Sequence, residues 1–243
     1  MEHELWLTKL FNDYLAGLGS AILGPLGIAG ENPQRPWENW FTMELFVVAL
    51  VVLTAAVLKA GLSVDKPGKL QHLFEVLHEF LSDTAHGLGM HHSEKFVPYF
   101  GTIFTFILSM NLIGIIPVFE SPTNFPWVPC GLAICTFVYY NYMGFRANGP
   151  SYLAHFAGPV WWLMPLMIPV ELISHFARPL SLTVRMFGNM FAGEQVTEVI
   201  LHLSYIVFPA IFMGLHVFVA FLQAYIFTLL TMIYVASATS HEH

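Results

Sequence analysis

The sequence predicts an all-α polytopic membrane protein, with about five membrane-crossing helices and one amphipathic helix at the membrane surface. Two observations carry this prediction. Hydrophobic residues make up 56% of the chain and charged residues only 10%, with a mean hydropathy of +0.63, whereas an ordinary soluble domain has roughly 25% charged residues. In addition, apolar runs long enough to cross the ~30 Å hydrocarbon core of a bilayer recur along the chain.

The expected order begins with an extracytoplasmic segment at residues 1–40. This segment lacks the pattern of a cleavable leader, because acidic residues precede its apolar ones. A single membrane domain follows over residues 41–243. Its first three spans are expected at residues 41–60, 98–117 and 127–146, each close to the ~20 residues that a crossing helix needs.

Residues 69–88, between the first two spans, have the pattern of an amphipathic helix. Apolar residues recur there at intervals of three and four, while polar residues occupy the opposite side. We expect this helix to lie on the membrane surface. Its apolar positions are Leu70, Leu73, Phe74, Leu77, Phe80 and Leu81.

Two remaining stretches, residues 160–203 and 204–237, are too long to cross the membrane upright. At 1.5 Å per residue they would measure about 66 and 50 Å as continuous helices, against a core of ~30 Å. We therefore expect two long, tilted helices that pair as an antiparallel hairpin. The prolines at which the first of them is expected to kink are Pro165, Pro169 and Pro179.

The distribution of basic residues predicts the orientation. Residues 117–126 contain no lysine or arginine, whereas basic residues follow the first and third spans. By the positive-inside rule, residues 59–97 and 144–159 are then cytoplasmic, so the N-terminus is outside and the C-terminus is inside. The basic residues concerned are Lys59, Lys66, Lys69, Lys95 and Arg146.

Several other classes of site are disfavoured. A net charge of −7 without a basic stripe argues against a nucleic-acid partner. Cys130 and Cys135 lie five residues apart on one expected helix, a rise of about 7.5 Å, which is too far for a disulfide. The histidine-rich loop lacks metal-ligand spacing and is interpreted as a solvated interfacial loop, so no metal or cofactor is expected. The ligands considered there are His86, His91, His92 and Glu94.

Ionisable residues inside the two long stretches are costly in a membrane and therefore point to function. Glu171, Arg178 and Arg185 recur every seven residues, which places them on one helical stripe. Three more polar residues, His175, Ser181 and Asn189, fall near the same stripe. A second row lies about half a turn out of phase, on the opposite face. Its members are Glu194, Glu198 and His202.

The second long stretch adds His216 and Gln223, seven residues apart and hence on one face. A hairpin that turns at residues 204–205 brings Arg185 level with Gln223 near the bilayer centre. The same turn brings Glu194 level with His216 nearer the outside, while Glu171 and His175 lie nearer the cytoplasm. Isolated hydrogen bonds between helices are the alternative explanation, and for Gln223 alone the two readings are equally good.

At this point the sequence resembles a known family. "RPLSLTVRMFGNMFAGE" (residues 178–194), followed by "HVFVAFLQAYIFTLLTMIYVASA" (residues 216–238), closely resembles subunit a of the F-type rotary ATP synthase, the membrane stator beside the ring of c subunits. "MNLIGIIP" and "GKLQHLFE" fit the same family, so the resemblance covers residues 68–238.

The resemblance implies an ion-translocating stator subunit without catalytic activity of its own. In that family the arginine at the position of Arg185 faces the ion-carrying carboxylate of the rotor. The residues matching its outer half-channel are Asn189, Glu194, His216 and Gln223. Glu171 and Ser181 match the side leading to the cytoplasm, where His175 also lies. Protons are the expected ions, and coupling to sodium is the alternative.

The resemblance also implies partners and a location. The partners are the c-subunit ring, b-type peripheral stalk subunits, the rest of the ATP synthase complex and the lipid bilayer. The expected location is a bacterial-type inner membrane, crossed several times. Two other functions were weighed: a secondary transporter with an intramembrane Glu/Arg/His substrate site would predict an internal repeat, and an intramembrane hydrolase would predict an HExxH or GxSxG element. The sequence contains neither feature.

Overall fold

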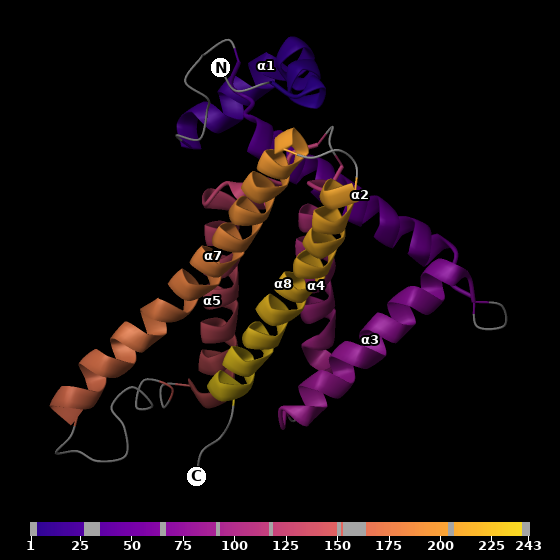
Figure 1. Cartoon of the computed structure of the whole chain (residues 1–243). Coiled ribbons are helices and arrows are strands. Elements are labelled where there is room, and N and C mark those ends of the chain that lie inside the picture. Colours follow the sequence, from indigo (N-terminus) through magenta and orange to yellow (C-terminus); the bar gives the residue numbers. More distant parts are fainter. Residues whose placement is uncertain are drawn as a thin grey trace. The chain divides into compact units, whose positions relative to one another are not determined.

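The computed structural model of the chain describes residues 4–26, 35–63, 67–90, 93–116, 119–149, 152, 164–203 and 207–239. In these ranges the regular structure is helical, and the all-α prediction is confirmed (Figure 1). The first helices are α1 (Trp6–Leu26), α2 (Asn39–Ala60), α3 (Lys69–Gly87), α4 (Val97–Ile113) and α5 (Trp127–Asn148). Short 3₁₀ turns, η1 (Ser93–Lys95) and η2 (Pro122–Asn124), precede α4 and α5.

The two long helices are α7 (Met164–Leu203) and α8 (Val207–Thr239). α7 continues through Pro169 and Pro179 as one helix of 40 residues, about 60 Å long at 1.5 Å per residue. Thr183 donates its hydroxyl proton to the carbonyl oxygen of Pro179 at 2.9 Å, inside this helix. Residues 160–163 and the expected turn at residues 204–205 lie outside the described residues.

Two described helices are long and apolar enough to cross a membrane by themselves, namely α2 and residues 208–239 of α8. α4 is a shorter apolar helix of the same kind. α3 occupies the range predicted for the amphipathic helix, and its Leu81 and Ala85 are buried. α1 was not predicted as a helix; it is bent at Leu15, whose backbone angles are not helical.

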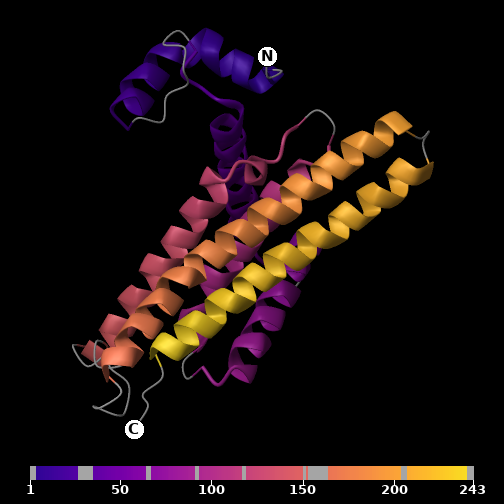
Figure 2. The ribbon, with the colours of Figure 1, turned by 60° about the vertical axis from the view of Figure 1, so that its left-hand side comes forward.

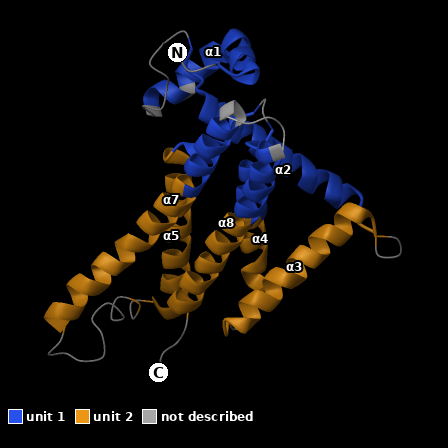
Figure 3. Cartoon of the chain, in the orientation of Figure 1, with its two compact units in different colours: residues 1–61, 105–125, 189–221 blue, residues 62–104, 126–188, 222–243 orange. Residues whose placement is uncertain are grey.

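The chain divides by its contacts into two compact units (Figure 3). Unit 1 comprises residues 1–61, 105–125 and 189–221, and unit 2 comprises residues 62–104, 126–188 and 222–243. In unit 1, the end of α7 and the beginning of α8 run in opposite directions as a hairpin (Figure 2). Each unit has its own buried apolar core, with Met43, Val47 and Met190 in unit 1. In unit 2 the core includes Phe100, Tyr140 and Phe227.

Candidate functional site

Unit 1 contains three of the predicted site residues, Asn189, Glu194 and His216. Glu194 is partly buried, and the carboxylates of Glu120 and Glu198 both interact with it electrostatically. Glu198 is one helical turn further along α7, whereas Glu120 comes from the connection after α4. Three acids from two segments therefore act on one another in this unit.

His216 packs directly against the backbone of α7. A Cβ atom added to Gly193 would lie 3.3 Å from both the Cε1 and the Nδ1 atoms of the His216 ring. Gly193 is the residue before Glu194. Its contact with His216 is therefore what the expected pairing of Glu194 with His216 in the hairpin predicts, to within one residue. The His216 Nε2 atom is buried and has no hydrogen-bond partner in the described part of the chain. It can therefore accept or donate a proton if water or an ion reaches it.

The connection after α4 is held by a compact set of hydrogen bonds. Ser121 donates to the carbonyl oxygen of Met110 at 3.1 Å, and Thr123 donates to Asn111 Oδ1 at 3.0 Å. Asn111 Nδ2 in turn approaches the carbonyl oxygen of Ala220 on α8 at 3.5 Å. This arrangement fixes the segment that carries Glu120.

Unit 2 contains the remaining predicted residues, beginning with Glu171 on α7. Its Oε1 atom lies 3.7 Å from Nη2 of Arg178 in an ion pair, with side chains that are 32% and 27% exposed respectively. The guanidinium of Arg178 also lies over the ring of Tyr234 from α8, 5.3 Å from its centroid. A cation over an aromatic face is attracted by the ring electrons. Arg178 is thus neutralised and held within its own unit.

His175 is buried and is bonded on both ring nitrogens by residues of α5. Nε2 lies 3.0 Å from Asn141 Oδ1, and Nδ1 lies 3.4 Å from the hydroxyl of Tyr140. The hydroxyl of Tyr152 donates to the same Asn141 oxygen at 3.1 Å. Burial raises the pKa of Tyr152 above its usual range, so the hydroxyl keeps the proton that it donates. These contacts fit a neutral imidazole protonated on Nε2.

Arg185 differs from Arg178 in its surroundings. Its Nη2 atom donates to the hydroxyl of Ser181 at 3.3 Å, one helical turn away. Among the described residues no carboxylate pairs with it, and its side chain is only partly buried. Gln223 is 2% exposed and belongs to the core of the same unit. Asn189, in unit 1, is exposed.

Sequence reasoning missed the residues that surround the predicted ones. Asn141 and Tyr140 lie in the run "YYNYM", a pattern typical of residues that pack in an apolar helix. A single asparagine within a span is nevertheless a signal, because a polar side chain in lipid needs a partner. Glu120 lies in a connection between helices, where acidic residues are common, so its position did not indicate a role. Nothing in the sequence indicated a role for Tyr234.

The described histidine of the histidine-rich loop, His86, makes its hydrogen bond outside these groups. His91 and His92 lie outside the described residues. His86 Nε2 lies 3.0 Å from the hydroxyl of Ser93, in the turn before α4. Chemically, the described groups are therefore of two kinds: acids and an imidazole that can exchange protons in unit 1, and a fixed positive charge with an acid–arginine pair in unit 2.

The chain is similar to known proteins over most of its length. A family model described as "ATP synthase A chain" matches residues 40–236. A relative from Solibacter usitatus, named "ATP synthase subunit a", is 58% identical over 96% of this chain and 100% of its own length. A relative of the same name from Koribacter versatilis is 47% identical over the full length of both chains, and one from Desulfosudis oleivorans is 41% identical over 82% of this chain and 87% of its own.

Proposed function

The chain belongs to the ATP synthase A chain family, and from this premise we propose that it guides protons along two offset paths separated by Arg185. It is the ion-translocating stator subunit of an F-type ATP synthase. The rest of that complex is its partner, and a membrane is its environment. The chain itself carries out no catalytic step in this proposal.

The different surroundings of the two arginines carry the proposal. Arg178 has a carboxylate partner at 3.7 Å and an aromatic ring beneath it. Arg185 donates to a serine hydroxyl at 3.3 Å and interacts electrostatically with Tyr234, and no carboxylate pairs with it among the described residues. A charge in a membrane normally pairs with an opposite charge. An arginine without a carboxylate partner in the described part of its own chain therefore suits a carboxylate supplied by another subunit.

The physical effect of Arg185 is large enough for this role. A unit charge about 4 Å from a rotor carboxylate contributes on the order of 4 kcal/mol in favour of the ionised acid, at an effective dielectric constant of ~20. An ionised carboxylate cannot pass through lipid, so each rotor site must release its proton beside Arg185 and take up another before it leaves. Guanidinium suits the task because it does not lose its own proton in proteins.

The two paths are assigned from the groups that can hold a proton. The outer path uses Glu194 and His216, with Asn189 and Gln223 as polar lining. The inner path uses Glu171 and Ser181, with His175 beside them. Support for the first comes from the packing of His216 on Gly193 and from the interacting acids around Glu194. Support for the second comes from the ion pair of Glu171.

The c-subunit ring and b-type stalk subunits are the proposed direct partners. Exposed apolar residues recur along one stripe of α7 in unit 2, which provides a surface for an apolar rotor or for lipid. They are Ile173, Phe176, Leu180 and Val184. We place the protein in a bacterial-type inner membrane, as the resemblance to subunit a implies. The distribution of basic residues places its N-terminus outside and its C-terminus in the cytoplasm.

The decisive experiment replaces Arg185 in the assembled complex. Arg185→Ala should abolish proton-driven ATP synthesis, and it should allow passive proton flux through membrane vesicles stripped of the catalytic head. The reason is that a protonated rotor site could then pass from one path to the other without a turn of the ring. Arg185→Lys should leak less than Arg185→Ala but couple poorly, because a buried ammonium can lose its proton.

Arg146→Ala is the matched control, since it removes an exposed arginine from the last turn of α5. That variant should synthesise ATP at the wild-type rate. Assembly of each variant is checked by the co-purified subunits. Near wild-type synthesis by an assembled Arg185→Ala complex would refute the role of Arg185.

A further inference from the structure

The proposed ion paths contain no residue of the N-terminal helix α1. The family match begins at residue 40, so it does not account for this helix. α1 is nevertheless tied firmly to the beginning of α2, within unit 1. Its position and its surface therefore call for an explanation of their own.

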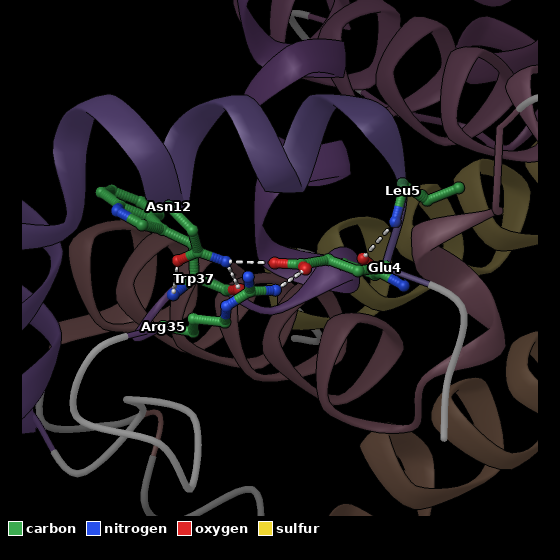
Figure 4. Close-up of polar contacts among 6 residues, drawn as sticks. Glu4, Leu5, Asn12, Arg35 and Trp37 are labelled. Atoms are coloured by element: carbon green, nitrogen blue, oxygen red, sulfur yellow. Dashed lines mark hydrogen bonds and ion pairs between the residues drawn. The ribbon is translucent and has the colours of Figure 1, made fainter.

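Asn12 makes the central attachment of α1. Its Oδ1 atom accepts a hydrogen bond from the backbone nitrogen of Trp37 at 3.0 Å, and its Nδ2 atom donates to the Trp37 carbonyl oxygen at 3.1 Å (Figure 4). The same Nδ2 donates to Glu4 at 2.8 Å, and Glu4 pairs with Arg35. Asn12 is buried, so these bonds are shielded from competing water.

The Trp37 side chain is held as well. Its ring nitrogen donates to the carbonyl oxygen of Leu15 at 2.9 Å, and its ring meets Phe11 edge to face at 5.4 Å. Gly19 leaves room for it, because a Cβ atom there would lie 2.5 Å from the ring nitrogen. A separate bond, from the Leu5 backbone nitrogen to Asn39 Oδ1 at 3.2 Å, joins the beginning of α1 to the first residue of α2. α1 is thus fixed to the end of a membrane-crossing helix.

This attachment leaves an apolar stripe of α1 uncovered. Trp6, Leu10 and Tyr14, at intervals of four, are 55%, 46% and 82% exposed. Leu7 and Phe11, on the neighbouring face, pack into the protein instead. Lys9 is exposed on the other side of the stripe, and the exposed Asp13, seven residues after Trp6, lies at the edge of the stripe. A tryptophan, a leucine and a tyrosine in register would be a poor choice for a surface in water.

The attachment of α1 to the beginning of α2 indicates that the lipid bilayer covers the apolar stripe of α1. α2 begins at Asn39 and exposes a belt of apolar side chains further along, which face lipid in a membrane-crossing helix. Trp37 precedes α2 by two residues and therefore lies at the level where the span meets the headgroups. Tryptophan and tyrosine are enriched at this depth, because their rings are apolar and their polar atoms are wet.

We propose that α1 is a membrane-surface helix, with Trp6, Leu10 and Tyr14 inserted at the boundary between headgroups and acyl chains beside the outer end of α2. Lys9 then remains in water. The apolar stripe of α1 continues the lipid-facing surface of α2, and Asn12 is the joint that holds the two helices together. The proposal needs a chain that crosses the membrane, and it is independent of the roles given to Arg185 or Glu194.

The test uses single cysteines in the intact complex, reconstituted in phosphatidylcholine vesicles. Leu10→Cys and Tyr14→Cys are labelled with the environment-sensitive dye NBD, after Cys130 and Cys135 and the reactive cysteines of the other subunits have been replaced. Lys9→Cys is the matched control, one position before Leu10 on the same helix. Emission is measured with lipid carrying a nitroxide near its headgroup, and separately with iodide in the water.

Labels at positions 10 and 14 should emit at shorter wavelength than the label at position 9, lose emission to the nitroxide lipid and resist iodide. The label at position 9 should show the reverse. Quenching of positions 10 and 14 by iodide would place the stripe in water and overturn the proposal. Protection of these positions from both quenchers would show that another subunit covers the stripe, which would overturn it equally.

Discussion

At the scale of single residues, the two arginines of α7 show how surroundings decide the use of a charge. Arg178 and Arg185 have the same side chain, and seven residues separate them on one helix. Arg178 is paired with Glu171 and lies over Tyr234, so its charge is used inside the chain. Arg185 has no carboxylate partner among the described residues, so in the proposed mechanism its charge acts on another subunit. Sequence spacing alone cannot make this distinction.

Arg178 should act by keeping Glu171 in place. Both side chains are about one-third exposed, so the pair should contribute nearer to the ~0.2–1 kcal/mol of an exposed pair than to the ~3–5 kcal/mol lost when a buried pair is broken. Arg178→Gln should therefore leave the complex assembled but slow ATP synthesis. In a Glu171→Gln background the same change should have little further effect, because the two residues act as a unit.

The check is a double-mutant cycle on the rate of proton-driven synthesis, with Arg178→Lys as the variant that keeps the charge. Lysine should restore much of the rate but not the planar contact with Tyr234. Strictly additive losses in the two single variants would mean that Arg178 does not work through Glu171.

Glu120 is a second residue whose effect can be anticipated. Its carboxylate interacts electrostatically with that of Glu194, and Asn39 Nδ2 donates to its Oε2 at 3.4 Å. Negative charge near the outer path should raise the local concentration of protons. Glu120→Gln should thus lower the rate of ATP synthesis partially, most clearly when protons outside are scarce, and Glu120→Asp should restore it.

Asp13→Asn serves as the comparison, because it removes an exposed acid from the same unit. The initial rate of synthesis is followed at several external pH values. Equal reductions of the rate by Asp13→Asn and Glu120→Gln would show that the total surface charge is responsible. They would contradict a specific effect of Glu120 on the outer path.

At the scale of helices, the positions of the helices follow the sequence most closely where the length of an apolar run determines them. α2, α4 and α5 lie where apolar runs of about 20 residues lie, since such runs have few alternatives in a membrane. Prolines in α7 were a weaker guide, because the helix continues through Pro169 and Pro179. The contact of Gly193 with His216 has the register expected from the position of the turn.

Other elements needed three-dimensional information. α1 depends on the bonds of Asn12 to Trp37, two residues with no local signal for pairing. The bonds of His175 to Asn141 link α7 to α5, and no periodicity within either helix specifies them. Periodic patterns identify which face of a helix is polar, but partners on another helix are set by packing.

Gly114 offers a test of helix packing. A Cβ atom there would lie 2.4 Å from the Cβ of Ser121 and 3.0 Å from its backbone nitrogen, so the connection after α4 would have to move. Forcing such contacts costs typically ~1–3 kcal/mol. Gly114→Ala should accordingly lower the midpoint of thermal unfolding of the purified complex and loosen the segment that carries Glu120.

Gly131→Ala is the matched control. Gly131 lies inside α5, with nothing within 4 Å of its added Cβ. Alanine in a helix is favoured over glycine by roughly 0.5–1 kcal/mol, so this variant should be as stable as the wild type or more stable. Equal stability of the Gly114 and Gly131 variants would show that the close approach to Ser121 is not a constraint.

At the scale of the whole molecule, the arrangement of charge along the chain predicts how it inserts. Residues 59–97 carry four lysines, whereas the connection at residues 117–126 carries neither lysine nor arginine. Positive loops remain on the cytoplasmic side during insertion. The orientation matters for mechanism, because reversing it would exchange the proposed inlet with the proposed outlet.

Cysteine labelling in sealed vesicles of known orientation tests this topology. Lys69 and Lys95 are exposed and lie on the predicted cytoplasmic side, while Asp13 and the 69% exposed Trp127 lie on the predicted outer side. Single cysteines at positions 69 and 95 should react with a membrane-impermeant maleimide only from the cytoplasmic face, and those at 13 and 127 only from the outside. Pro122 is a worse reporter, because it is buried.

Each variant is also labelled after detergent treatment, which should make all four positions reactive and so separates a shielded cysteine from one on the far side of the membrane. Reaction of positions 69 and 95 from outside would reverse the orientation. Glu194 and His216 would then lead to the cytoplasm, and protons would pass Glu171 first. Reaction of position 13 on the same side as position 69 would instead contradict the crossing by α2, the apolar helix that separates them.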